Sequence, residues 1–253
     1  MRLFLALSVA IVLASTSASA EAPAGEPTIE ELLDAVDDAN RGASSEGRMT
    51  MNVKTSRWER SMTMDLWSRG EDHSLIRIVS PAKEAGMATL RAEENIWNYL
   101  PKVDRTMKVP AGMMSGNWMG SHFTNNDLVR SSRFADDFNA KIIQRPTGAE
   151  EGSWIIECIP KPDAPVVWGK VLVTVSAKHR IGESVTYWDE DGQLVRTMSF
   201  SDVQMRGDKA VPMKMKMVPA DSPSEFTEVI YDKLNFDVDL PDSIFTLQSI
   251  RRR

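Results

Sequence analysis

The chain has 253 residues, of which 42% are hydrophobic and 26% charged, and its net charge is −6. These values are typical of an ordinary globular protein and exclude a disordered chain or a collagen-like repeat. The single cysteine, Cys158, excludes internal disulfides and zinc sites built from several thiolates, and the acidic balance argues against a nucleic-acid partner.

Residues 1–20 have the features of a secretory signal peptide. Arg2 precedes an apolar run from Leu3 to Leu13, and the residues Ala18-Ser19-Ala20 match an A-x-A cleavage site. The residue directly after that site is not a cysteine, so no lipid anchor is expected there. No later apolar run approaches the roughly 18–20 residues of a membrane helix. We expect a periplasmic protein with a single domain over residues 21–253.

A helix is expected after a short leader. Thr28 and Glu31 have the spacing of a capping box, and Gly42 is the expected end of the helix. Apolar residues from Ile29 to Val36 recur at helical spacing on one stripe. The pattern predicts an amphipathic helix of about 13 residues that packs on a sheet and is also compatible with covering a ligand cavity.

From Gly47 onward, apolar residues recur at every second position, which is typical of strands with one apolar face. The first two strands are expected around residues 49–53 and 58–66. Further strands are expected over residues 73–79, 87–92, 95–100, 104–109, 138–145, 153–159, 168–176, 183–189, 193–203, 210–218 and 226–236. Glycine turns at 69–72, 190–192 and 206–208 join neighbouring strands. The pattern predicts a mainly β protein with one large antiparallel sheet.

The segment from Pro110 to Arg133 interrupts the strand pattern. It is too long for a hairpin loop and is rich in large apolar side chains, with glycines at every fourth position. Those glycines predict a weak helix that could move, so we interpret the segment as a short helical lid. The alternative is an ordered insertion at the sheet edge. The candidate lid residues are Met113, Met114, Trp118, Met119 and Phe123.

The sequence supplies 15 methionines and 7 tryptophans rather than reactive groups. Methionine adapts to irregular or variable partners, and one predicted helix is too small to cover so large a sheet. The sheet therefore either curls onto itself or holds an apolar ligand, although a conventional core with methionine as filler stays open. The candidate residues of the concave wall are Trp58, Met62, Met64, Leu66, Trp97 and Tyr99.

Catalytic, metal and cofactor motifs do not emerge from the sequence. Ser121, His122 and Asp127 are residue types used in nucleophilic catalysis, but neighbours in sequence do not make a triad. No nucleophile elbow, H-E-x-x-H pattern or phosphate-binding loop occurs. We expect a non-enzymatic protein without a metal or cofactor. A hydrolase that acts on envelope lipids through His122 is the alternative.

Four stretches resemble the outer-membrane lipoprotein-sorting protein family, the relatives of the periplasmic carrier LolA. They are ENIWNYLPK at 94–102, GNWMGSHFTNNDL at 116–128, YWDEDGQL at 187–194 and LPDSIFT at 240–246. The resemblance covers nearly the whole chain after the signal peptide, and the second stretch is its most specific part. His122 stands where the family usually has an acidic residue before Phe-Thr-Asn.

The resemblance implies a strongly curved antiparallel sheet that forms an incomplete β-barrel, with helices over its mouth and acyl chains bound on its concave face. It implies a carrier of lipid or acylated lipoprotein that works with an inner-membrane transporter or an outer-membrane acceptor. An accessory subunit of an envelope lipid exporter, without free cargo, is the other function that the resemblance leaves open.

Overall fold

The computed structural model describes residues 26–39, 42–129 and 133–251. The predicted signal peptide at 1–20 lies outside the described residues. None of the helices in these ranges combines the length and the apolar character that crossing a membrane requires.

Thirteen strands form one antiparallel sheet in the spatial order β6-β5-β4-β3-β2-β1-β13-β12-β11-β10-β9-β8-β7. Every strand predicted from the alternation of apolar residues is present, with ends that differ by a few residues. The strands are β1 (Ser44–Lys54), β2 (Glu59–Arg69), β3 (His73–Ser80), β4 (Ala88–Ala92), β5 (Asn95–Leu100), β6 (Arg105–Lys108), β7 (Phe138–Gln144), β8 (Ser153–Pro160), β9 (Lys170–Ser176), β10 (Gly182–Trp188), β11 (Leu194–Arg206), β12 (Lys209–Pro219) and β13 (Phe226–Phe236).

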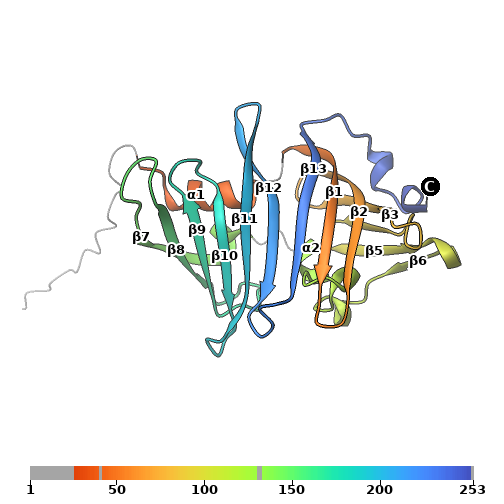
Figure 1. Ribbon diagram of the computed structural model, residues 1–253, viewed down its shortest axis with the longest axis horizontal. Coiled ribbons are helices and arrows are strands. Elements are labelled where there is room, and N and C mark those ends of the chain that lie inside the picture. The colour runs from red at the N-terminus through yellow and green to blue at the C-terminus, as the bar shows by residue number, and fades with distance from the viewer. Residues whose placement is uncertain (1–25, 40–41, 130–132, 252–253) are drawn as a thin grey trace, which may run out of the picture.

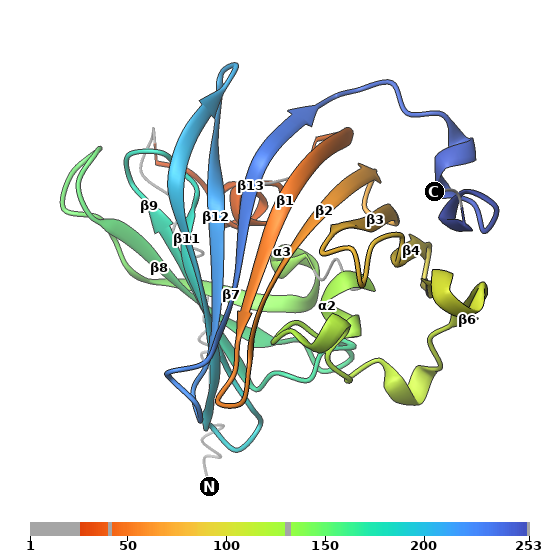
Figure 2. The same cartoon turned by 45° about the vertical axis from the view of Figure 1, so that its right-hand side comes forward.

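The sheet is curved and open. In Figure 1, β5 and β6 lie almost crosswise to β1 and β13, and the turned view in Figure 2 shows the concave side. Strands β6 and β7 are the two edges and are not paired with each other in the described part of the chain. Tight turns with Gly70, Gly192 and Gly207 at positive φ join neighbouring strands, as the sequence predicts.

The chain crosses from one edge of the sheet to the other between β6 and β7. It does so over the concave side, where its short helices lie in Figure 2. Any connection between opposite edges of an open curved sheet has to pass over one of its faces. The other short helices lie after β5 and near the C-terminus. The crossing holds 3-10 helices at Ala111–Met113 and Trp118–Gly120, α2 (Asn125–Val129) and α3 (Phe134–Asp137), and the remaining 3-10 helices are Pro101–Val103, Asp242–Phe245 and Ser249–Arg251.

Helix α1 (Ile29–Asp37) packs on the concave face of β7–β10. The capping box forms as predicted: the Glu31 amide donates to the Thr28 hydroxyl at 3.1 Å, and the Thr28 amide donates to the Glu31 carboxylate at 2.8 Å. The helix ends at Asp37, which is earlier than the predicted stop at Gly42. The backbone leaves helical geometry at Asp38, which has φ −97° and ψ 1° and whose amide makes the last bond of the helix, to the Asp34 carbonyl oxygen at 2.8 Å.

The convex face of β3–β5 is covered by the C-terminal segment. Leu75, Leu90 and Tyr99 form a cluster there with Phe245 and Ile250, and Trp97 packs against it. The expectation that Trp97 and Tyr99 face the same side as Met62 and Met64 is therefore wrong. Both aromatic residues point away from the concave face because a second apolar layer, formed by the chain end, lies on the opposite side.

Candidate functional site

A cavity of about 490 Å³ lies between the concave face of the sheet and the segment that crosses it. This volume is within the roughly 300–1,000 Å³ of sites that hold one small ligand. Apolar side chains dominate the wall, and several of them are methionine or aromatic. The sheet residues that form the apolar wall include Met49, Leu66, Ile76, Val185, Met198, Phe200, Met215, Met217, Val229 and Tyr231.

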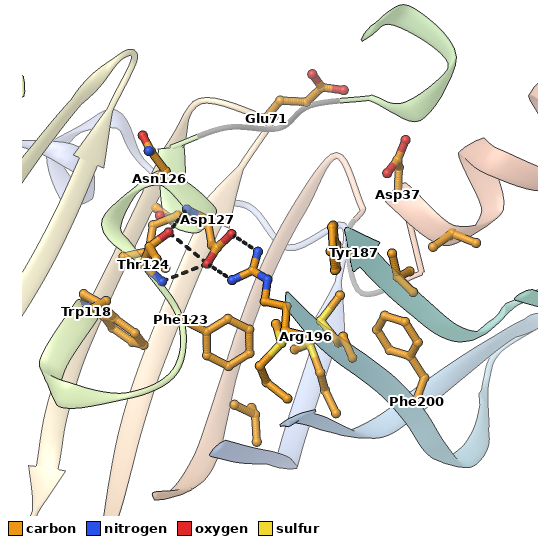
Figure 3. Close-up of a pocket in the computed structure, with 18 of the residues that line it drawn as sticks. Asp37, Glu71, Trp118, Phe123, Thr124, Asn126, Asp127, Tyr187, Arg196 and Phe200 are labelled. Carbon is orange, nitrogen blue, oxygen red and sulfur yellow. Dashed lines mark hydrogen bonds and ion pairs between the residues drawn. The ribbon is translucent and has the colours of Figure 1, made fainter. Parts of the chain in front are cut away.

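Two aromatic side chains of the crossing segment close the cavity on one side (Figure 3). Trp118 is buried, and its indole N–H donates to the Thr89 hydroxyl on β4 at 3.1 Å. Phe123 points into the same space and packs against a methionine cluster on β1 and β2, formed by Met49, Met51, Met62 and Met64. The indole therefore has the polar partner that a buried tryptophan requires, and this contact fixes the segment against the sheet.

A buried ion pair joins the crossing segment to β11 inside the cavity. The two terminal nitrogens of Arg196 donate to the two oxygens of Asp127 at 2.6 and 2.8 Å. Thr124 donates to Asp127 Oδ2 through its amide at 2.8 Å and its hydroxyl at 2.9 Å (Figure 3). The guanidinium also lies over the rings of Trp168 and Tyr187, with 4.7 and 4.8 Å to the ring centroids.

Both members of this pair stay charged. Burial acts to raise the pKa of Asp127, but the hydrogen bonds from Arg196, its charge and the bonds from Thr124 outweigh it, so the pKa is lowered. Burial acts to lower the pKa of Arg196, and the contacts with Asp127 outweigh that effect and raise it. The pair is therefore a fixed electrostatic contact, and its two charges cancel within the cavity.

Arg133 joins two elements at the other end of the cavity. Its Nη2 lies 2.6 Å from Asp34 Oδ1 on α1, and its Nη1 lies 2.6 Å from Glu71 Oε1 in the turn between β2 and β3. Asp38 Oδ2 is 3.8 Å from the same Nη2. In Figure 3, Glu71 and Asp37 lie at this end, away from Trp118. Three carboxylates thus surround one guanidinium at the opening.

The structure brings together only part of the predicted wall and lid. Met62 and Met64 are buried in the methionine cluster on the concave face of β2, and Leu66 lines the cavity beside them. From the crossing segment, Trp118 and Phe123 line the cavity.

The remaining candidates lie elsewhere. Trp97 and Tyr99 are on the convex face, as described above. Trp58 lies in the turn before β2 with 41% of its surface exposed, and the Arg60 guanidinium is 5.4 Å from its ring. The direction of the Trp58 side chain is set by the geometry of this turn, so the alternation of apolar residues along β2 does not predict it.

The methionines of the lid candidates are also dispersed. Met113 is 61% exposed, and Met114 lines a separate surface pocket with Glu94 and Lys108. Met119 packs beside the methionine cluster, and its carbonyl oxygen accepts a bond from Arg60. These three side chains do not line the large cavity.

Ser121, His122 and Asp127 are not arranged as a triad. The Ser121 hydroxyl is buried and donates to the Trp118 carbonyl oxygen at 2.8 Å. His122 Nδ1 instead lies 2.8 Å from the hydroxyl of Thr227, whose side chain is fully buried, and Asp127 is held by Arg196. These contacts hold the crossing segment against β13 and β11. No cluster of three metal-ligand side chains occurs among residues 26–39, 42–129 and 133–251.

Sequence reasoning missed the pair of Arg196 and Asp127. A signal for it is present, because Arg196 occupies the same face of β11 as Met198 and Phe200. A charged residue in an apolar series requires a partner, and Asp127 is the acid that the crossing segment supplies.

A family model described as that of an uncharacterized protein matches residues 70–252. The chain belongs to this family of uncharacterized proteins. Comparison with curated proteins gives no match. Three solved structures share the fold of this family member, at sequence identities of 18–22%. The resemblance to LolA-like proteins predicted from the sequence is confirmed.

A putative outer membrane lipoprotein-sorting protein domain from Vibrio parahaemolyticus is 22% identical, with a TM-score of 0.74 over 88% of this chain and 98% of that one. A LolA superfamily protein from Nitrosomonas europaea is 20% identical, with a TM-score of 0.71 over 88% and 99%. A DUF1329 family protein from Desulfovibrio piger is 18% identical, with a TM-score of 0.75 over 87% and 97%. The similarity therefore covers most of both chains in each comparison.

Proposed function

We propose that this protein is a non-enzymatic periplasmic carrier that shelters the hydrocarbon chain of a lipid or lipoprotein. The observation that supports the proposal most strongly is the cavity of about 490 Å³ between a methionine-rich concave wall and a segment that covers it. Its solved structural neighbours include an outer membrane lipoprotein-sorting domain and a LolA superfamily protein. Residues 21–253 act as one domain in this proposal.

The driving force is removal of hydrocarbon from water. Each buried methylene contributes about 0.8 kcal/mol relative to water, so a chain of about ten carbons contributes roughly 8 kcal/mol before the costs of binding. Transfer from a bilayer gives almost none of this energy, because the chain already lies in hydrocarbon. A carrier of this kind therefore requires a membrane partner that delivers the cargo and another that accepts it.

The segment containing Trp118 and Phe123 serves as the lid in this proposal. It is held by localised polar contacts, the indole bond to Thr89 and the pair of Asp127 with Arg196, rather than by strand pairing along its length. Discrete contacts of this kind can be broken and remade without unfolding the sheet.

Binding of the apolar fluorophore N-phenyl-1-naphthylamine to the full chain tests the carrier proposal. Fluorescence enhancement with a one-to-one stoichiometry is expected for the wild-type protein. Met198→Trp should reduce binding at least tenfold because the larger side chain occupies the cavity. Ser199→Trp is the matched control, since Ser199 is exposed on the opposite face of the same strand. Circular dichroism of both variants establishes that they are folded.

Two results would contradict the carrier proposal. The first is a wild-type protein that does not enhance the fluorescence, and the second is equal binding by the two folded tryptophan variants. Mass spectrometry of an organic extract from protein purified without detergent then identifies the natural cargo.

A further inference from the structure

The wall of the cavity changes from apolar to polar along three neighbouring strands. One row across β1, β2 and β3 is Met49, Met64 and Ile78, and the next is Gly47, Leu66 and Ile76. The third row, two residues further along each strand, is Ser45, Ser68 and Ser74, and all three serines line the cavity. The concave face of these three strands is thus apolar over the first two rows and carries hydroxyl groups in the third.

The hydroxyl row is built into the fold and belongs to the cavity rather than to the surface. Ser45 is 1% exposed, and its hydroxyl lies 2.6 Å from that of Ser68. Hydroxyl groups at a buried wall position are costly unless they are hydrogen-bonded. Such a row beside methionine and leucine suits a ligand that is itself apolar along most of its length and polar at one end.

The charges at this end of the cavity are predominantly negative. Asp37, Asp38 and Glu71 line it, and Arg133 is the one base among the described lining residues there. Its guanidinium is already within 4 Å of three carboxylates. The nearby Lys209 donates to the Asp38 carbonyl oxygen at 2.6 Å and is not part of the lining.

An anionic head group would therefore meet excess negative charge at this end and would have to compete with carboxylates for Arg133. At the other end, Arg196 is neutralised by Asp127 at 2.6 Å. The side chains of Asp38 and Glu71 retain 49% and 47% exposure, so the polar end is the one that opens to solvent. A head group placed there stays hydrated while the chain enters the apolar part.

We propose that the natural ligand class is a single-chain amphiphile whose head group is a hydroxyl or an amine rather than a carboxylate or phosphate. This inference rests on the carrier function proposed above and specifies its cargo. The head group lies against the row of Ser45, Ser68 and Ser74 beside Glu71, and the chain lies against the methionine wall under Trp118. The volume of about 490 Å³ suits one such molecule.

Competition between dodecylamine and dodecanoate for bound N-phenyl-1-naphthylamine tests the head-group preference. Both probes carry the same apolar chain and are used below their micellar concentrations at pH 7.5 and low ionic strength, with the full chain. Dodecylamine should displace half of the fluorophore at a concentration at least tenfold lower than dodecanoate. Comparable displacement by both, or stronger displacement by dodecanoate, would overturn the inference.

Variants separate the effect of the cavity charges from the different water solubilities of the probes. Asp38→Asn with Glu71→Gln should lower the ratio of the two displacement concentrations at least fivefold. Glu59→Gln with Asp65→Asn is the matched control, because it removes the same charge from the convex face of β2 and should leave the ratio unchanged. Equal ratios in the two double variants would overturn the inference.

The serine row has its own comparison. Ser68→Val with Ser74→Val should weaken displacement by dodecanol at least threefold, whereas Ser61→Val on the exposed face of β2 should not. An unchanged value in the first variant contradicts the hydroxyl contact. If the fluorophore does not bind to the wild-type protein at all, the carrier proposal fails as well. If it binds without any head-group preference, only the present inference fails.

Discussion

Removing the charge of Asp127 should destabilise the protein much more than removing an equally well-formed surface charge pair. Asp127→Asn leaves the guanidinium of Arg196, a side chain that is 9% exposed, without its counter-charge. Two charge-assisted hydrogen bonds of about 1.5–3 kcal/mol each are affected. Breaking a buried pair from one side costs about 3–5 kcal/mol, so we expect a loss within that range in the free energy of unfolding.

The assay is urea unfolding at pH 7, followed by tryptophan fluorescence. Asp65→Asn is the control, because Asp65 also makes a two-bond contact with an arginine, Arg48, at 2.7 and 3.0 Å. The Arg48 side chain is 50% exposed, whereas that of Arg196 is 9% exposed, so water can solvate Arg48 when its partner is lost and the unfolding free energy should change little. Arg196→Met completes a double-mutant cycle with Asp127→Asn. The double variant should lose about 1–3 kcal/mol less than the sum of the two single losses, because it contains no buried guanidinium without a counter-charge.

The effect of Asp127→Asn should also depend on pH. The pKa of Asp127 is lower in the folded protein than its ordinary value of 3.8, so the carboxylate contributes its full stabilisation above pH 3.8. That contribution is lost as the pH falls from 3.8 through the folded-state pKa. The difference between wild type and variant should therefore shrink in this acidic window. Equal losses for Asp127→Asn and Asp65→Asn at pH 7 would refute the reasoning.

Three further variants or treatments test other parts of the structure. Thr28→Ala removes the capping box of α1 and should cost about 1 kcal/mol in urea unfolding, whereas an unchanged midpoint would contradict it. Trp118→Phe removes the bond to Thr89 and should cost about 1 kcal/mol. Thr89→Val also removes the bond from Thr89 to Asn98, but the two substitutions together should cost less than the sum of the single losses; fully additive losses would argue against the bond between Trp118 and Thr89. Burial raises the pKa of Cys158 to about 12, so a thiol reagent at pH 8 should react only after urea is added, and rapid reaction of the native protein would be the contrary result.

The positions of the strands could be predicted from the sequence because the solvent-exposed face of most strands is polar. In β2, Met62, Met64 and Leu66 alternate with Thr63 and Asp65, and the apolar set lies on the concave face as the pattern suggests. The capping box at the start of α1 was equally accessible, since its two residues are three positions apart. Local spacing is sufficient for features of this kind.

The sequence pattern does not predict which face of the sheet carries the aromatic residues of β5. Trp97 and Tyr99 alternate with Ile96 and Asn98, and both faces of this strand are partly apolar. The deciding contact is with Phe245, which lies 146 residues after Tyr99 in the sequence, and alternation contains no information on such a partner. The same limit applies to the pairing of Asp127 with a strand that follows it much later in the sequence.

The position of β13 has a consequence for how the protein reaches its native state. This last strand pairs with β1, the first, and with β12, so it joins two six-strand meanders at the middle of the sheet. Neither meander can complete the central pairing until nearly all of the polypeptide is available. The pairing of β13 with β1 should therefore be a late and slow step of folding, after the hairpins within each meander have formed.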